Sequence, residues 1–379
     1  MLNEPHTQAA LWRDNPISII TPLLQPNTQC KELVLLHPTT SEPDELQRFL
    51  SHRGIKLTSV PYNPTDFSPE TLKPYSVQAI NLSQGNMGEK DKLLTWAREN
   101  DIPCYWLDHQ TDTMSFLSPH CDQPIPIADK LKIEEFLSLK GIQVTEIERN
   151  PPNYSDWIKV ANQWVNNLSR YAKGFRTLNY LAKTANANNH LTEALTLAQQ
   201  NNLALRRMVD DLEQNGLLAR HEDKLQFANA DAKRFCNGIW LEYYAFAQLK
   251  ELKKSRSDVQ DIAMSVKVER GDKNNPLRNE VDVMALINNR LYIIECKTGM
   301  LKPQESQLAL YRLDSLAEVF GPLTQGALLS FDSISPLIKR RANEININVL
   351  DSKNMVQVKN AIDKRASVFS TPEQASLEY

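Results

Sequence analysis

The hydrophobic positions of roughly the first third of the chain alternate between short apolar runs and longer segments with helical spacing. Apolar runs at residues 32–37 (ELVLLH), 77–82 (VQAINL) and 103–107 (PCYWL) have the length of strands. Residues 43–53 and 90–99 have the spacing of amphipathic helices. Strands that alternate with helices are typical of a doubly wound parallel sheet, so we expect a Rossmann-like α/β domain over residues 1–150.

A change of pattern follows Pro151 and Pro152, a proline pair that disfavours helical backbone just before it. Residues 157–168 repeat apolar side chains at helical spacing, and residues 201–216 read as a helix that stops at Asn-Gly. Residues 217–227 (LLARHEDKLQF) resemble a hairpin. The pattern predicts a helical, winged-helix-like module over residues 151–235. A structural spacer and a DNA-binding module are both open interpretations of it.

The last part of the chain returns to mixed helix and strand. Residues 238–250 predict a strong helix, and residues 280–288 and 290–296 predict two strands joined at an Asn-Asn turn. Further elements are expected at residues 261–270 (strand), 304–319 (helix) and 326–331 (strand). We expect a third domain, of mixed α/β fold, over residues 236–379.

Composition narrows the class of protein. Of 379 residues, 41% are hydrophobic and 23% are charged, which excludes wholesale disorder. Lysine and arginine number 43 against 46 aspartates and glutamates, so a uniformly basic nucleic-acid coat is excluded, whereas a local basic cleft is not. From the sequence we expect no membrane span and no secretory signal. The 5 scattered cysteines contain no CxxC pair. We expect a reduced cytoplasmic protein without a zinc site.

The stretch at residues 279–299 (NEVDVMALINNRLYIIECKTG) carries the candidate chemistry. Two strands joined by a tight turn bring Asp282, near the start of one, toward Glu295 and Lys297, near the end of the other. Side chains alternate along a strand, so Glu295 and Lys297 share a face and Cys296 points away. Charged groups at the end of a core strand are costly unless they pair or bind a metal.

Such a set of residues suits a hard divalent cation. Asp282 and Glu295 offer the oxygen ligands that Mg²⁺ and Mn²⁺ prefer, with the Cys296 carbonyl as a third candidate. Lys297 would lie beside the attacking water or the developing oxyanion. Glu242, on the preceding helix, could orient water or complete the metal ligands. An ordinary hairpin with a surface Glu–Lys pair is the alternative, and the conjunction of all these residues favours a metal-dependent nuclease.

These residues resemble the PD-(D/E)xK nuclease superfamily. More closely, the chain resembles the two-part CRISPR ancillary nucleases that join an N-terminal CARF domain to such a nuclease. Residues 235–242 (FCNGIWLE), 279–298 and 308–321 (LALYRLDSLAEVFG) carry the nuclease part of the resemblance. The resemblance implies a homodimer that cleaves nucleic acid with Mn²⁺ or Mg²⁺. It also implies metal ligation by Asp282 and Glu295, catalysis by Lys297 and support from Glu242.

The N-terminal part resembles CARF domains, which bind cyclic oligoadenylate across a dimer axis. Residues 80–93 (INLSQGNMGEKDKL) lie where that family carries Asn-x-Thr-Gly-Gly-Thr-Lys. Gln84 replaces a glycine of that motif, and Asn86 and Met87 replace Thr-Lys. The resemblance implies cyclic tetra-adenylate, while these departures leave an altered ligand or a lost sensor open. The candidate ligand-binding residues are Asp14, Asn15, Thr39, Thr40, Asn81, Ser83, Gly85 and Asn86.

Three functions stay open at this point. The first is a nuclease allosterically activated by a cyclic oligoadenylate in antiviral CRISPR defence. The second is a nucleotide-sensing regulator that binds DNA and whose nuclease domain is inactive. The third is a constitutive nuclease of repair or restriction type. Arg312 and Tyr311, on the helix after the hairpin, are candidate contacts to a phosphate and a base, or simply parts of an amphipathic helix.

Overall fold

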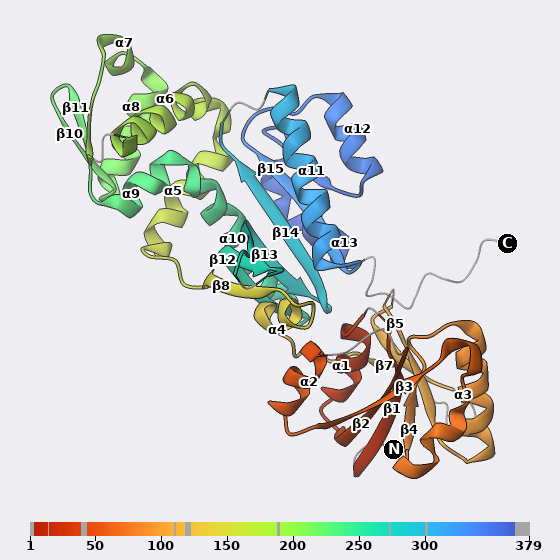
Figure 1. Ribbon diagram of the computed structural model, residues 1–379. Coiled ribbons are helices and arrows are strands. Elements are labelled where there is room, and N and C mark those ends of the chain that lie inside the picture. Colours follow the sequence, from red (N-terminus) through yellow and green to blue (C-terminus); the bar gives the residue numbers. More distant parts are fainter. Residues whose placement is uncertain are drawn as a thin grey trace.

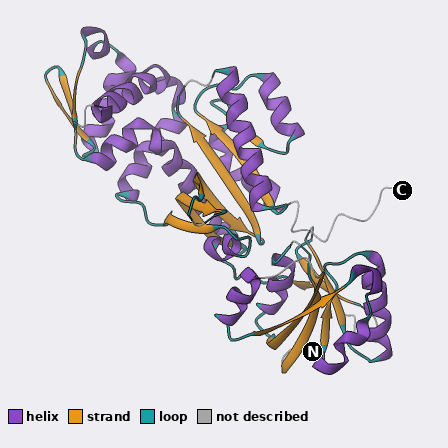
Figure 2. Ribbon diagram, viewed as in Figure 1, coloured by secondary structure: helices purple, strands orange, loops and turns teal. Residues whose placement is uncertain are grey.

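A computed structural model describes residues 4–13, 15–38, 44–109, 111–117, 123–187, 190–272, 274–299 and 302–367. The chain forms an N-terminal α/β region, a mostly helical middle and a C-terminal α/β region (Figure 1). Strands concentrate in the first and last of these, and helices dominate between them (Figure 2). The predicted mixed α/β architecture is confirmed. The domain boundaries after residues 150 and 235 stay predictions.

The N-terminal region is built on a seven-stranded sheet in the order β3-β2-β1-β4-β5-β6-β7. Its first five strands are parallel, and β6 and β7 are antiparallel additions at one edge. Helices α1 and α2 share a core with one face, and α3 packs on the other, as expected of a doubly wound sheet. The elements are β1 (Pro5–Leu11), α1 (Ile17–Leu23), β2 (Gln29–Pro38), α2 (Asp44–Ser51), β3 (Lys56–Tyr62), η1 (Pro64–Asp66), η2 (Pro69–Tyr75), β4 (Ala79–Asn81), α3 (Met87–Glu99), β5 (Cys104–Asp108), β6 (Thr113–Phe116) and β7 (Ile125–Pro126).

The central strand of this sheet, β1, has no clear hydrophobic alternation in the sequence. Its polar residues His6 and Gln8 are buried and joined by a 2.7 Å hydrogen bond. The Tyr105 hydroxyl also donates to Gln8 Oε1 at 2.5 Å. Because these partners come from tertiary structure, the polar residues fit the core although the sequence pattern argues against a strand.

The middle contains α5 (Tyr154–Asn166), α6 (Leu168–Ala187), α7 (Leu197–Gln200), α8 (Leu203–Gln214) and α9 (Ala230–Arg234). The predicted hairpin is present as β10 (Leu218–His221) and β11 (Lys224–Phe227), with β9 (Thr192–Ala194) completing a small sheet in the order β10-β11-β9. The aromatic core of this module continues into the C-terminal region. The Phe175 ring, for example, stacks on Trp240 with centroids 4.7 Å apart. The helical module therefore packs directly on the C-terminal region.

The C-terminal region is built on a six-stranded sheet in the order β16-β15-β14-β13-β12-β8. Asn288 and Asn289, both at positive φ (49° and 54°), form the predicted turn between β13 and β14. β8 lies within residues 1–150 but pairs with β12, so it belongs to this second sheet. The elements are α4 (Ile133–Ser138), β8 (Gln143–Glu148), η3 (Phe235–Ile239), α10 (Trp240–Ser255), β12 (Val259–Arg270), β13 (Leu277–Ile287), β14 (Arg290–Lys297), α11 (Pro303–Phe320), β15 (Thr324–Ser330), α12 (Pro336–Glu344), β16 (Asn348–Leu350), η4 (Met355–Gln357) and α13 (Val358–Ser367).

The two faces of this sheet pack against different helices. Ile294 and Cys296 join the core that contains α10 and α13, whereas Leu291 and Ile293 join the core that contains α11 and α12. Glu295 alternates with Ile294 and Cys296, so it lies on the α11 side, as the strand period predicts. Within the described ranges, no helix has both the length and the hydropathy needed to cross a bilayer.

Candidate functional site

The hairpin β13–β14 brings the predicted carboxylates together. Val283 pairs with Ile294, and Asp282 and Glu295 are the next residues on the two strands. Asp282 Oδ2 accepts a 2.6 Å hydrogen bond from the Cys296 amide, which fixes this carboxylate against the end of β14. Glu295 is almost fully buried, with 2% of its surface exposed. The hairpin therefore holds both groups rigidly at the point where the two strands stop pairing.

Two cations neutralise the buried Glu295. Lys297 Nζ, two residues along β14, donates to Glu295 Oε1. The Arg312 guanidinium, on α11, donates to the same oxygen at 3.1 Å and to the Glu280 carbonyl oxygen at 2.8 Å. Arg312 is thus part of the site, where it bonds a carboxylate. Because it is half-exposed, its remaining N–H groups face solvent on the α11 side.

The pKa values of the site residues reflect burial first and a surplus of negative charge second. Burial, followed by the nearby charge of Glu295, raises the pKa of Asp282 to about 7. Burial, followed by the charge of Asp282, also raises the pKa of Glu242 well above its usual range. Burial alone would lower the pKa of Lys297, but the charge and hydrogen bond of Glu295 outweigh it and raise that pKa. The three predicted carboxylates therefore interact electrostatically, as carboxylates that share one cation do.

Gly238 lies just before α10, the helix that carries Glu242. The segment Phe235–Ile239 winds as a π-turn with Gly238 at φ 126°, and Glu242 follows in the first turn of α10. A Cβ on Gly238 would come within 2.4 Å of Thr298 Oγ1, directly after β14. The same oxygen accepts from Asn179 Nδ2 at 3.2 Å. Gly238 thus lets the start of α10 approach the end of β14.

The donor chemistry of this site fits a hard divalent cation. Among the described residues, no three His, Cys, Asp or Glu side chains converge on one coordination position. Mg²⁺, however, usually takes only one or two carboxylates and completes its octahedron with water and substrate phosphate. Asp282 and Glu295 supply two such carboxylates, and their mutual repulsion favours a cation between them. The Cys296 carbonyl stays a predicted third ligand.

The second group of predicted residues lies beyond the carboxyl end of β4. The Asn81 side chain is buried and donates to the Ser18 carbonyl oxygen at 2.8 Å. Its Oδ1 accepts from the Ser83 amide at 2.9 Å, and Ser83 Oγ accepts from the Leu107 amide at 3.0 Å. Asn81 and Ser83 therefore tie the loop after β4 to α1 on one side and to β5 on the other.

Gln84, where the CARF motif has glycine, is nearly buried and connects this loop to the one after β1. It donates to the Asn15 carbonyl oxygen at 2.7 Å and accepts from the Arg13 amide at 2.8 Å. Gln84, which replaces the glycine of the CARF motif, thus bonds the loop after β4 to the loop after β1. The Asn15 side-chain oxygen beside it is buried and has no hydrogen-bond partner among the described residues.

Gly85 and Asn86 begin the helix that follows. Gly85 has φ 98° and a Cβ there would meet Leu11 at 2.3 Å, so only glycine fits. The Asn86 side chain caps α3 by accepting a hydrogen bond from the Glu89 amide. In return, the Glu89 carboxylate accepts a hydrogen bond from the Asn86 amide. The predicted residues Asp14, Thr39 and Thr40 lie outside the described residues.

Sequence reasoning did not identify the partners that hold this loop. Buried Glu89 accepts two bonds from Arg13, at 2.5 and 2.7 Å, and one from Tyr62 at 2.8 Å. Burial raises the pKa of Glu89, but these bonds and the Asn86 amide outweigh it and lower that pKa. The capping pattern Asn-x-x-Glu was a readable signal for Glu89. No sequence spacing could have paired it with Arg13.

Comparison with known protein families gives a match in the C-terminal part of the chain. Residues 229–369 match the family model of the Card1-like endonuclease domain. A search of curated protein sequences gave no match. The matched segment contains Glu242, Asp282, Glu295 and Lys297.

Solved structures resemble the whole chain. Protein VC1899 from Vibrio cholerae has a TM-score of 0.88 at 24% identity, over 96% of this chain and 98% of that one. Can2 from Sulfobacillus thermosulfidooxidans, solved with cyclic tetra-adenylate, has a TM-score of 0.75 at 20% identity, over 96% of this chain and 99% of that one. A type III CRISPR defence DNA nuclease activated by cyclic oligoadenylate has a TM-score of 0.53 at 15% identity, over 91% of this chain and 48% of that one. The predicted resemblance to two-part CRISPR nucleases is thus confirmed.

Proposed function

We propose that this protein is a metal-dependent nuclease activated by a cyclic oligoadenylate, with cyclic tetra-adenylate as the first candidate. The observation that carries the proposal is the carboxylate pair Asp282–Glu295, with Lys297 bonded to Glu295, within a segment that matches a Card1-like endonuclease domain. Can2, which has the same fold, was solved with cyclic tetra-adenylate.

In this proposal the hairpin residues and Glu242 of α10 have different roles in phosphodiester hydrolysis. Asp282 and Glu295 hold Mg²⁺ or Mn²⁺, which when bound activates water and stabilises the charge that develops on the phosphate. Lys297, kept protonated by Glu295, contributes positive charge beside the oxygens of the reacting phosphate. Glu242, whose pKa is raised by burial and by the charge of Asp282, would orient the attacking water.

The ligand would bind beyond the carboxyl ends of β1 and β4, where ligands of doubly wound sheets bind. The unpartnered Asn15 oxygen lies there beside the Gln84 contact. The Asn86–Glu89 capping box uses two of the amides at the start of α3, and the amides of Met87 and Gly88 between them suit a phosphate group. Met87, in the first turn of α3, is 81% exposed, which suits burial against the second subunit of the expected homodimer.

A continuous set of contacts connects the ligand loop to the catalytic strand. Ser83 accepts from the Leu107 amide of β5. The His109 carbonyl, two residues further, accepts from the Arg290 guanidinium. Arg290 is the first residue of β14, and Glu295 and Lys297 lie at its other end. A ligand that shifts the loop after β4 would therefore act on the strand that carries the metal ligands.

The test measures cleavage of labelled single-stranded DNA, single-stranded RNA and supercoiled plasmid with Mn²⁺, with and without cyclic tetra-adenylate. Glu295→Ala should abolish cleavage, and the matched control Glu251→Ala, on the exposed face of α10, should retain it. Cleavage that ignores the ligand but needs Glu295 would favour a constitutive nuclease. Metal-independent duplex binding without any cleavage would favour the DNA-binding regulator.

A further inference from the structure

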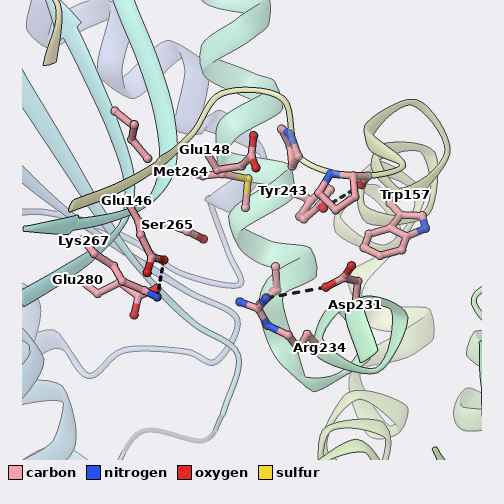
Figure 3. A pocket seen from close by; sticks show the side chains of 14 residues that line it. Glu146, Glu148, Trp157, Asp231, Arg234, Tyr243, Met264, Ser265, Lys267 and Glu280 are labelled. Atoms are coloured by element: carbon pink, nitrogen blue, oxygen red, sulfur yellow. Dashed lines mark hydrogen bonds and ion pairs between the residues drawn. The ribbon is translucent and has the colours of Figure 1, made fainter. Parts of the chain in front are cut away.

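The structure contains a cavity of about 350 Å³ (Figure 3). Its lining includes Glu280, which lies two residues before Asp282 on β13. Its apolar lining includes Trp157, Tyr243 and Met264. Glu280 and Arg234, which also line it, are close enough to Glu242 to change the pKa of that carboxyl. The cavity is therefore a neighbour of the catalytic carboxylates, and its volume falls in the range of small-molecule sites.

One wall of the cavity holds a strained residue. Ser265 has φ 49°, a left-handed conformation that is unusual for a residue other than glycine, asparagine or aspartate. It lies on β12 where the pairing with β8 shifts register between Met264 and Lys267. Bulges often occur next to active sites, where they re-aim a side chain. Here the bulge places the Ser265 side chain in the cavity wall (Figure 3).

The charges of the cavity select against a phosphate in its interior. Four carboxylates (Glu146, Glu148, Asp231 and Glu280) face two cations (Arg234 and Lys267). Lys267 is already paired with Glu146 at 2.6 Å. Carboxylates accept hydrogen bonds, so the interior suits a flat group with N–H donors, such as the amino edge of a nucleobase.

Two acceptors are placed for such an edge. Glu148 uses one oxygen to accept from the Asn150 amide at 2.6 Å, and a carboxylate has further acceptor positions. The Ser265 hydroxyl is the second. Arg234 is exposed and makes an ion pair of 3.9 Å with Asp231, which leaves guanidinium N–H groups for a phosphate at the cavity mouth.

We propose that this cavity binds the base of the nucleotide next to the scissile phosphate, with Glu148 and Ser265 reading its amino group and Arg234 contacting its phosphate. This inference rests on the proposed nuclease function. It predicts that adenine, cytosine and guanine are preferred over thymine or uracil at one position flanking the cut. A well-made contact of this kind discriminates about tenfold.

The experiment has two arms on the full chain. In the first, a randomised single-stranded pool is cleaved with Mn²⁺ and cyclic tetra-adenylate, and base frequencies flanking the cuts are sequenced. In the second, binding of dAMP, dCMP, dGMP and dTMP is measured by calorimetry without metal. Both arms use the wild type, Glu148→Gln, Ser265→Gly and the control Glu251→Gln. Ser265→Gly keeps the left-handed backbone while removing the hydroxyl, so it tests the contact without unfolding the bulge.

The expected result is an approximately tenfold preference in both arms that Glu148→Gln reduces below twofold, that Ser265→Gly weakens and that Glu251→Gln retains. Cleavage without a preference at any flanking position, or a preference that both cavity variants retain, would overturn the subsite and leave the nuclease standing. Selective mononucleotide binding that needs Glu148, without cleavage, would support the subsite as a nucleotide site and overturn the nuclease. Equal binding of all four mononucleotides without cleavage would overturn both.

Discussion

Replacing Gly238 by alanine tests whether the junction between α10 and β14 positions the proposed catalytic residues. Gly238 has φ 126°, which L-residues rarely adopt, and an added Cβ would lie 2.4 Å from Thr298 Oγ1. Holding alanine in this backbone conformation costs about 1–3 kcal/mol. Relieving the overpacking costs about 1–3 kcal/mol more. Because the backbone of Thr298 continues from Lys297, the displacement acts directly on the site.

We expect Gly238→Ala to destabilise the protein by about 2–6 kcal/mol, the sum of these two costs. A chain of 379 residues has an unfolding entropy of about 0.8 kcal/mol/K, so Tm should fall by about 3–8 °C. We also expect a loss of cleavage of about tenfold or more at a temperature where the variant is folded, because small displacements of reacting groups cost that much. Differential scanning fluorimetry and a cleavage assay with Mn²⁺ measure the two effects. Gly271→Ala is the matched control, since Gly271 has φ 86° but a Cβ added there would have no atom within 4 Å.

A second substitution separates the two costs. Thr298→Ala removes the hydroxyl that the new methyl group meets, so in the Gly238→Ala background it should recover the overpacking cost and leave the backbone cost. The double-mutant cycle should show favourable coupling of about 1–2 kcal/mol. Additive effects of the two substitutions, or a Gly238→Ala protein with wild-type Tm and cleavage, would refute this account of the junction.

Four further outcomes are expected. Arg312→Ala should slow cleavage at least tenfold, because Glu295 loses the 3.1 Å bond that holds it in position; a change below twofold in the cleavage rate at saturating Mn²⁺ contradicts this. Asp282→Asn should raise the Tm measured in EDTA, since burial and Glu295 oppose the ionised aspartate, and should abolish the Tm increase caused by Mn²⁺. Burial raises the pKa of Asp351, but the bonds from Lys339 and from backbone amides lower it overall, so the ionised carboxylate stabilises the fold above the unfolded pKa of 3.8. This stabilisation is lost as the pH falls through the lower folded pKa. In urea titrations, Asp351→Asn should therefore be less stable than the wild type at pH 7 and should lose less stability on acidification. Arg290→Ala should leave basal cleavage unchanged and reduce stimulation by cyclic tetra-adenylate at least threefold, and unchanged stimulation would exclude the contact with His109 as the route of coupling.

The fold was predictable where local pattern and tertiary environment agree. The hairpin β13–β14 has apolar strands, an Asn-Asn turn and polar ends, and each feature favours the same structure. The pairing of β8 with β12 was not predictable, because the two strands lie more than a hundred residues apart in the sequence. The alternation of side chains along a strand shows which face is buried, but it does not show which other strand pairs with it. The buried polar strand β1 was hidden for the related reason that its hydrogen-bond partners come from elsewhere in the sheet.

Some residues of the candidate site were predictable from the sequence, and some of their contacts were not. Asp282, Glu295 and Lys297 were predictable because strand alternation and a two-residue turn fix their relative positions. Arg312 was predicted as a candidate phosphate contact or a part of an amphipathic helix. Its bond to Glu295 was not predictable, since that bond depends on how α11 packs against the sheet. The Ser83 loop was recognisable from its motif, but its internal bonds through Gln84 were not, because they depend on the loop after β1.

One strand connects the two halves of the proposed mechanism. Arg290 begins β14 and contacts the N-terminal region, and Lys297 ends it at the candidate metal site, a distance of about 23 Å for an extended strand. β14 lies between β13 and β15 inside the sheet, so it cannot bend easily and would transmit a shift as a rigid body. A shift along its axis would move Glu295 and Lys297 together relative to Glu242, which lies on α10. Regulation by this route would therefore change the distance between the proposed metal ligands and Glu242, the residue proposed to orient the water, while the Glu295–Lys297 pair would stay intact.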